Sequence, residues 1–307
     1  MTQQGYGAST GKVILVGEHA VTFGQPAIAI PFLSGKTEVT LTLTDDIGQA
    51  YVESDVYSGD IATAPIHLKA MITSFIEENN IKQGLHVSIQ SVIPFERGLG
   101  SSAAVAVAFV RACADLLGQT LTDEDLITYA NQSEKIAHGK PSGIDAKTIV
   151  TGKPVRFQRG EATPLPPLCF KGYLIVADTG IKGETKQAVE DVHRLCDENP
   201  AYLNDITRIG TLVESANEAI VQGDIYMLAD IFNECQTLLE HLTVSHEKIE
   251  KIIRASKTAG AIAGKLTGGG RGGSMILLAD TYNTAEAVAQ AAMDAGAQHT
   301  WIQSLGG

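Results

Sequence analysis

Glycine is concentrated in a few segments of this chain, and these segments limit what it can fold into. The chain has 31 glycines in 307 residues, against a usual share of about 7%. No triplet period links them, so a collagen-like fold is excluded. Because glycine lets one backbone approach another group closely, the segments predict loops packed against a ligand or another loop. The clustered glycines stand at positions 5, 7, 11, 17, 24, 98, 100, 139, 143, 268, 269, 270, 272 and 273.

Composition and charge exclude several classes of protein. Hydrophobic residues make up 44% and charged residues 19% of the chain, which is typical of a globular protein. The length of 307 residues favours two domains. A net charge of −12 argues against nucleic acid or an anionic membrane as a partner, because both need clustered Lys and Arg. A small anionic ligand is still compatible, since helix N-termini and a few cations suffice to bind it.

The cysteines and the apolar runs predict a cytoplasmic protein. The four cysteines are at least 27 residues apart, so we expect neither a disulfide framework nor a thiolate zinc site. The segment MTQQGYGAST has no signal-peptide pattern. The longest apolar run, 103–110, has eight residues, well short of the roughly 18 that a membrane span needs.

Hydrophobic periodicity predicts two differently ordered halves. In the first half we expect strands over 12–16, 27–33, 37–44, 49–53 and 84–91, and helices over 66–78, 101–117, 122–138 and 143–150. A proline cluster at 163–167 predicts a boundary between domains 1–165 and 166–307. In the second half we expect strands over 173–177, 261–266, 274–278 and 300–303, and helices over 184–196, 203–222, 224–242, 246–259 and 284–295. Without its extra helices this half has the β-α-β-β-α-β order of ferredoxin-like sheets.

The segment PFERGLGSSAA, residues 94–104, has the strongest chemical pattern. A strand ends, glycines turn the chain, and a helix begins on small residues. Several backbone N–H groups would then point at one spot at the positive end of the helix dipole, where phosphate binds well. A helix start without a ligand is the alternative, because the segment is neither a Walker A motif nor a full GxGxxG.

Three further segments carry polar residues that suit phosphoryl transfer. GKVILVGEHAV places Lys12 at one end of a buried strand and Glu18-His19 at the other. KLTGGGRGGS, residues 265–274, has more glycine than a hairpin needs. Glu134 ends one helix and Asp145 starts the next, so the two carboxylates can converge across the turn. Phosphoryl transfer needs a phosphate cradle, a Mg²⁺ ligand and a group that orients the accepting hydroxyl. Taken singly, Lys12 is better explained as a solvated strand end, and Glu18-His19 could be a hydrogen-bonded loop pair. The segment from Glu134 to Asp145, taken singly, is better explained as a surface helix end with a capping Asp.

Together, in this order and spacing, these motifs resemble the three-motif pattern of the GHMP kinase superfamily. GEHAV followed by GQPAIA, HGKPSGID, and DTG ahead of TK are similar to the mevalonate kinase family within it. The resemblance extends from about Gly7 to the end of the chain. It implies an α+β fold with an N-terminal domain like ribosomal protein S5 domain 2 and a ferredoxin-like C-terminal domain. It also implies ATP-dependent phosphorylation of the C5 hydroxyl of (R)-mevalonate, a step of isoprenoid precursor biosynthesis.

The resemblance assigns the binding of ATP and Mg²⁺ to particular residues of this chain. Ser102 and Glu134 would hold Mg²⁺ against the β- and γ-phosphates. Thr267 and the glycines after it would close over the site. The residues implied to bind ATP are Gly98, Leu99, Gly100, Ser101, Ser102, Ala103 and Ala104, with Gly268, Gly269 and Gly270.

The same resemblance assigns the acceptor site. Asp145 would be the general base, or the group that orients the hydroxyl. Lys12 would lie near it and lower the hydroxyl pKa. Glu18, His19 and Thr185 would line the mevalonate pocket, and a homodimer is implied as well.

Three positions depart from the family pattern. Gly183 stands where an arginine is frequent, which leaves Lys182 or Lys186 to bind the mevalonate carboxylate. Arg97 stands where a small residue is common, and we expect it to be solvated rather than to contact phosphate. Arg271 interrupts the last glycine run, where it could contact phosphate or be solvated.

Other functions stay open at this stage. Another small-molecule kinase of the superfamily, such as a phosphomevalonate kinase, is the nearest alternative, although no cation cluster for a second phosphate is evident. A regulator that binds ATP without catalysis would not need the four residues Lys12, Ser102, Glu134 and Asp145 together. An RNA-binding role would rest on the S5-like fold alone, and a fold by itself does not carry a function.

Overall fold

The computed structural model describes residues 3–138 and 143–306, which form two compact units. Unit 1 comprises the chain up to Gly11 together with 35–95 and 100–152, and unit 2 comprises 12–34, 96–99 and the chain from Lys153. Each unit therefore joins segments that are far apart in the sequence. The boundary after residue 165 stays a prediction. Residues 139–142 of the HGKPSGID motif lie outside the described residues.

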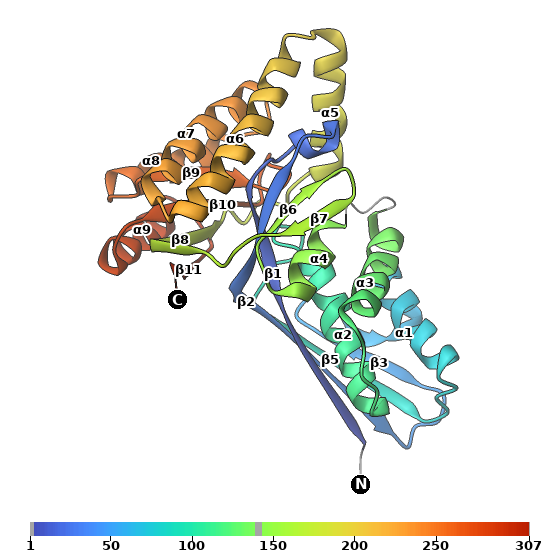
Figure 1. The fold of residues 1–307 in the computed structure, drawn as a ribbon. Helices are drawn as coiled ribbons and strands as arrows, with labels where there is room; N and C mark the ends of the chain where they lie inside the picture. The colour runs from blue at the N-terminus through green and yellow to red at the C-terminus, as the bar shows by residue number, and fades with distance from the viewer. Residues whose placement is uncertain (1–2, 139–142, 307) are drawn as a thin grey trace. The chain divides into compact units, whose positions relative to one another are not determined.

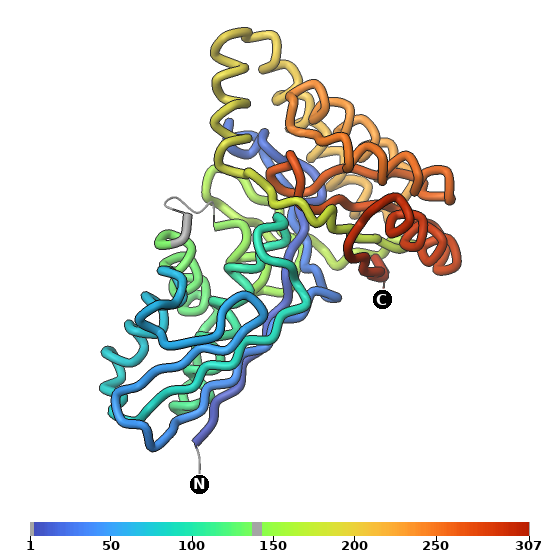
Figure 2. Tube along the Cα trace, turned by 180° about the vertical axis from the view of Figure 1, so that it is seen from behind, coloured from blue at the N-terminus to red at the C-terminus, as the bar shows by residue number. Residues whose placement is uncertain are grey.

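In unit 1, helices gather on one face of a sheet (Figures 1 and 2). Strand β5 (Gly84–Ser91) pairs in parallel with β3 (Ala50–Glu53), which pairs with β4 (Ser58–Asp60). The helical elements are η2 (Ile61–Thr63), α1 (Ile66–Glu78), α2 (Ser101–Leu117), α3 (Asp123–His138) and α4 (Ile144–Thr151). Helices α2, α3 and α4 pack against one another. The predicted bounds of α1, α2 and β5 are confirmed.

Helix α2 occupies the core of unit 1 because its small residues let a strand approach it closely. A Cβ on Gly7 would lie 2.1 Å from the Ala108 carbonyl oxygen, and one on Gly5 would lie 2.3 Å from that of Ala112. Both glycines belong to β1 (Gln4–Val16). These two glycines of the cluster thus serve strand–helix packing rather than a ligand or another loop.

Strand β2 (Ala27–Thr44) is a single long strand where the sequence predicts two. Residues 27–29 pair with β6 (Val155–Gln158), and residues 37–44 pair with β5. Because each end has its own partner strand, the chain stays extended through Gly35, and the predicted break at 34–36 is wrong. Strands β4, β6 and β7 (Glu161–Pro164) are further elements that the periodicity did not reveal.

Unit 2 contains the predicted ferredoxin-like sheet. Its four strands are antiparallel in the order β11-β8-β10-β9. Their bounds are Cys169–Asp178 for β8, Ala263–Thr267 for β9, Ser274–Ala279 for β10 and His299–Gly306 for β11. Helices α6 (Tyr202–Gln222), α7 (Ile225–His241), α8 (Glu247–Thr258) and α9 (Tyr282–Asp294) pack on this sheet, and α5 (Thr185–Glu198) packs on α6. Figure 1 shows these helices as yellow to red coils.

Two further features concern the whole described chain. None of the helices within 3–138 and 143–306 is both long and apolar enough to cross a membrane. Cys113, Cys169, Cys196 and Cys235 are free thiols, and all except Cys169 are buried.

Candidate active site

His19 is held in a strained, buried position three residues after the end of β1. It precedes the 3₁₀ turn η1 (Ala20–Phe23) with a φ of 58° and a ψ of −46°, and a positive φ is uncommon for a residue with a side chain. Its side chain is nearly buried, and Nε2 lies 3.0 Å from the Gly269 carbonyl oxygen. Burial lowers the pKa of the imidazole to about 4. The ring is therefore neutral near pH 7, with Nε2–H as donor and Nδ1 left as an acceptor.

Gly269 connects His19 with the start of α5. A Cβ at Gly269 would lie 2.4 Å from Thr185 Oγ1 and 2.6 Å from Thr185 Cα, so only glycine fits there without a shift. His19, Gly269 and Thr185 therefore converge in unit 2 from three distant segments. The sequence predicts each of them as a site residue, and their roles toward a ligand stay predictions.

Glu18 is fully buried and paired with Lys265 of β9. Lys265 Nζ donates to Glu18 Oε1 and also to the Leu266 carbonyl oxygen at 2.7 Å. Burial raises the pKa of the Glu18 carboxyl, and the Lys265 charge opposes that rise. Sequence reasoning missed Lys265. The available signal was a lysine in a short, otherwise apolar run directly before the glycine loop.

Gly98, at the start of the predicted phosphate loop (residues 98–104), lies against the last glycine loop (residues 268–273). A Cβ on Gly98 would lie 3.2 Å from the Thr267 carbonyl oxygen, and one on Gly268 would lie 3.0 Å from Gly98 Cα. Both glycines have positive φ, of 79° and 81°. Lys12, which is 4% exposed, donates its backbone N–H to the Leu99 carbonyl oxygen at 2.9 Å. Unit 2 thus brings together Lys12, residues 98–99 and the last glycine loop.

Unit 1 contains the N-terminus of α2 and the two carboxylates that the sequence predicts as site residues. Gly100 precedes α2 with a φ of 73°, and the first N–H groups of such a helix lack intrahelical partners. Ser102 Oγ is buried without a hydrogen-bond partner among the described residues. Glu134 is buried in α3, and Asp145 lies half-buried in the first turn of α4. Lys12 belongs to unit 2, so its predicted proximity to Asp145 stays a prediction.

The basic residues near the motifs are mostly engaged with carboxylates. Arg97 is 17% exposed, and its Nε lies 3.1 Å from Asp178 Oδ1, so the expectation that it is solvated is wrong. Lys182 Nζ lies 2.5 Å from a Glu96 carboxylate oxygen. Arg271, which interrupts the last glycine run, forms an ion pair with Asp191 on α5. The tertiary contacts bring these partners from distant parts of the chain, so the sequence pattern contained no signal for them.

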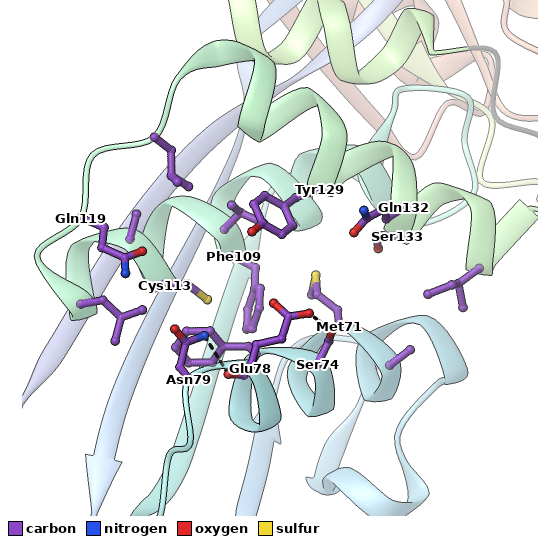
Figure 3. A pocket seen from close by; sticks show the side chains of 17 residues that line it. Met71, Ser74, Glu78, Asn79, Phe109, Cys113, Gln119, Tyr129, Gln132 and Ser133 are labelled. Carbon is purple, nitrogen blue, oxygen red and sulfur yellow. Dashed lines mark hydrogen bonds between the residues drawn. The ribbon is translucent and has the colours of Figure 1, made fainter.

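A cavity of about 390 Å³ lies elsewhere, between α1, α2 and α3 of unit 1 (Figure 3). Met71, Phe109 and Tyr129 project into it, and none of the predicted site residues lines it. Glu78 is the one charged side chain among the described residues of its wall. A wall with a carboxylate and without a cation does not suit the phosphates of ATP.

Comparison with known proteins identifies the family. Residues 67–153 match the GHMP kinases N terminal domain, and residues 216–298 match the GHMP kinases C terminal family. A mevalonate kinase of Pyrococcus horikoshii is 34% identical over 297 residues, which cover 89% of this chain and 88% of that protein. The chain belongs to the mevalonate kinase family of GHMP kinases.

Solved structures support the assignment of this chain to the mevalonate kinase family. The crystal structure of mevalonate kinase from methicillin-resistant Staphylococcus aureus MRSA252 is 51% identical, with a TM-score of 0.84 over 99% of this chain and 100% of that one. The L. major mevalonate kinase in complex with R-mevalonate is 28% identical, with a TM-score of 0.86 over 98% and 95%. The two-domain GHMP kinase fold predicted from the motifs is thereby confirmed.

Proposed function

We propose that this GHMP kinase transfers the γ-phosphoryl group of ATP to the C5 hydroxyl of (R)-mevalonate and yields 5-phosphomevalonate. The observation that carries the proposal is the convergence of His19, Gly269 and Thr185 in unit 2. These residues come from three of the segments whose motifs resemble the family, and a mevalonate kinase is similar along essentially the whole chain.

The phosphates of ATP would bind the turn from Gly98 and the first turn of α2. Glycine at 98 and 100 permits the left-handed turn, and the N–H groups of Ser101 to Ala103 present donors at the positive end of the helix dipole. The residues fit a Mg²⁺ ion, because Ser102 Oγ is a buried oxygen without a partner among the described residues. Ser102 and Glu134 would hold the ion, which would neutralise charge on the β- and γ-phosphates.

Asp145 would orient the C5 hydroxyl and accept its proton. Carboxylates are weak bases for an alcohol, so proton transfer must be late. Lys12 would lower the hydroxyl pKa and neutralise charge on the transferring phosphoryl group. Positioning and charge neutralisation would then supply most of the rate acceleration.

His19, Thr185 and Glu18 would define the mevalonate pocket. The neutral His19 ring offers Nδ1 as an acceptor for a substrate hydroxyl. The fully buried Glu18 would act through its neighbour His19 rather than by direct contact. Because Lys182 is engaged by Glu96, we assign the mevalonate carboxylate to Lys186, which is exposed in the first turn of α5.

The remaining expectations belong to this proposal. We place the enzyme in the cytoplasm, as a homodimer without nucleic-acid or membrane partners. Buried free thiols support the cytoplasmic location, and the net charge of −12 argues against nucleic-acid and anionic-membrane partners. The homodimer rests on the family resemblance alone.

An ADP-release assay with several acceptors tests the function. The purified enzyme is given ATP, Mg²⁺ and either mevalonate, phosphomevalonate, homoserine or galactose, and the product mass is determined. We expect turnover with mevalonate and a product heavier by one phosphoryl group, which is lost when EDTA removes Mg²⁺. Turnover with phosphomevalonate but not mevalonate would replace the proposal with the phosphomevalonate kinase alternative.

A further inference from the structure

The segment that leads into the phosphate loop, residues 96–99, is held by an ion pair that the proposed chemistry does not require. Arg97 Nε lies 3.1 Å from Asp178 Oδ1 at the end of β8. Arg97 Nη2 also donates to the Gly180 carbonyl oxygen at 3.2 Å. Asp178 is 1% exposed, so its carboxylate is almost completely removed from water. A charge buried to this degree needs a partner, and Arg97 supplies it.

A second pair of contacts joins the same two segments. Lys182 Nζ lies 2.5 Å from Glu96 Oε2, and the Gly183 N–H donates to the Glu96 carbonyl oxygen at 3.1 Å. Glu96 has a φ of 57°, a left-handed conformation that is unfavourable for a residue with a Cβ. Such a conformation persists only where surrounding contacts hold it. The loop 178–183 provides these contacts.

The loop 178–183 is also bonded to the last glycine loop. Thr179 Oγ1 donates to the Gly273 carbonyl oxygen at 2.6 Å, and the Gly273 N–H donates to the Ile181 carbonyl oxygen at 2.7 Å. A Cβ on Gly273 would lie 3.1 Å from the Arg97 carbonyl oxygen. One short loop therefore fixes both the segment leading into the phosphate loop and the loop predicted to close over ATP.

We propose that Arg97 is a positioning residue for the nucleotide, acting through its ion pair with Asp178. The pair fixes residues 96–98 in the strained turn from which Gly98 and Gly100 redirect the chain into α2. The backbone of Gly98 and Leu99, which is predicted to bind ATP, therefore depends on a side chain that does not itself contact ATP. This inference rests on the proposed ATP site, and it adds a role for a residue that departs from the family pattern.

The test compares nucleotide affinity among four single variants and one double variant. Arg97→Met removes the charge and keeps much of the length, whereas Arg97→Lys keeps the charge but cannot contact Asp178 and Gly180 in the same way. Asp178→Asn keeps an acceptor at Oδ1 for the Gly180 N–H but removes the carboxylate charge. Arg208→Met is the matched control, because Arg208 makes a two-point ion pair with Glu234 between α6 and α7.

The readouts are the Kd of a non-hydrolysable ATP analogue, the KM of each substrate and the unfolding midpoint. For Arg97→Met we expect the Kd and the KM for ATP to rise about tenfold, with the KM for mevalonate changed less than about twofold. Arg97→Lys should restore part of the affinity. The double variant Arg97→Met/Asp178→Asn should bind ATP no more weakly than Arg97→Met alone, because the pair acts as a unit.

Two results would overturn the proposal. One is nucleotide affinity in Arg97→Met within about twofold of Arg208→Met. The other is equal weakening of both substrates in proportion to a lower unfolding midpoint, which would make Arg97 merely structural. The binding measurement needs no turnover. If the wild-type enzyme binds the analogue but does not phosphorylate mevalonate, the proposed function is contradicted. The role of Arg97 is then decided by the nucleotide affinities of the variants.

Discussion

Lys265 on β9 donates a hydrogen bond to Glu18, and neither side chain is exposed to solvent. The two residues are 247 positions apart, and each lies beside a motif of the site: Glu18 precedes His19, and Lys265 precedes the glycine loop. The pair therefore connects the first and last motifs in the interior of unit 2. Gln236 of α7 adds to this connection by accepting a hydrogen bond from the Leu266 N–H at 2.9 Å.

Loss of Lys265 should destabilise the fold strongly. Lys265→Met would leave the Glu18 carboxylate buried without a counter-charge, so we expect the free energy of unfolding to fall by about 3–5 kcal/mol in denaturant titrations. The double variant Glu18→Gln/Lys265→Met should recover much of this loss because no charge remains buried. Lys257→Met, at an exposed position near the end of α8, is the control. A loss of less than about 1 kcal/mol for Lys265→Met would show that the pair contributes little.

His19 should make the stability depend on pH. The folded ring stays neutral down to a pKa of about 4, whereas the unfolded chain takes up a proton near its ordinary pKa of 6.5. The stability is therefore fully present above pH 6.5 and falls as the pH decreases toward 4, by about 3 kcal/mol.

The pH effect of His19 is measured by comparison with His19→Asn. Asparagine adopts a positive φ more readily than most residues, and both proteins retain Glu18, whose raised pKa acts in the opposite direction. Urea unfolding at several pH values between 4 and 7 should show a shallower dependence in the variant. Equal dependence in both proteins would contradict the burial of a neutral ring.

Gly269 should not accept a side chain. Its φ does not demand glycine, but an added methyl group would collide with Thr185 Cα and Oγ1, so α5 or the loop must move. We expect Gly269→Ala to lower kcat/KM for mevalonate by at least about tenfold. For the unfolding midpoint, Gly183→Ala is the control because its Cβ would meet nothing closer than 3.6 Å. Unchanged kinetics in Gly269→Ala would indicate that the contact between Gly269 and α5 does not shape the site.

Asp145 should be required for turnover but not for nucleotide binding. Asp145→Ala removes the group that orients and deprotonates the hydroxyl, so the steady-state rate should fall below detection while an ATP analogue binds with nearly wild-type affinity. Rate assays and calorimetric titration check the two halves of this prediction. Full activity in the variant would exclude Asp145 from the base role.

Lys12 should act on the rate more than on affinity. Its charge would stabilise the developing alkoxide and the transferring phosphoryl group, both of which carry more charge in the transition state than in the ground state. We expect Lys12→Met to lower kcat by at least about a hundredfold and to raise either KM by less than about fivefold. A loss confined to KM would instead assign Lys12 to binding alone.

The sequence by itself determined the local features of this protein. Helix α2 begins and ends where a glycine turn meets a small-residue run, and β5 spans its alternating pattern, because these signals act within a few residues. Motif order and spacing were enough to predict the family and the ferredoxin-like sheet. They also predicted His19, Gly269 and Thr185 as site residues, and these three residues lie together in unit 2.

Only the tertiary structure decided the features that depend on distant partners. Strand β2 is continuous because β5 and β6 pair with its two ends, although Gly35 suggested a break. Arg97 is ion-paired because Asp178 is buried beside it, and Lys265 is buried because Glu18 compensates its charge. The charge and length of a side chain follow directly from the residue type. Its burial and its partner depend on long-range packing, which local patterns do not encode.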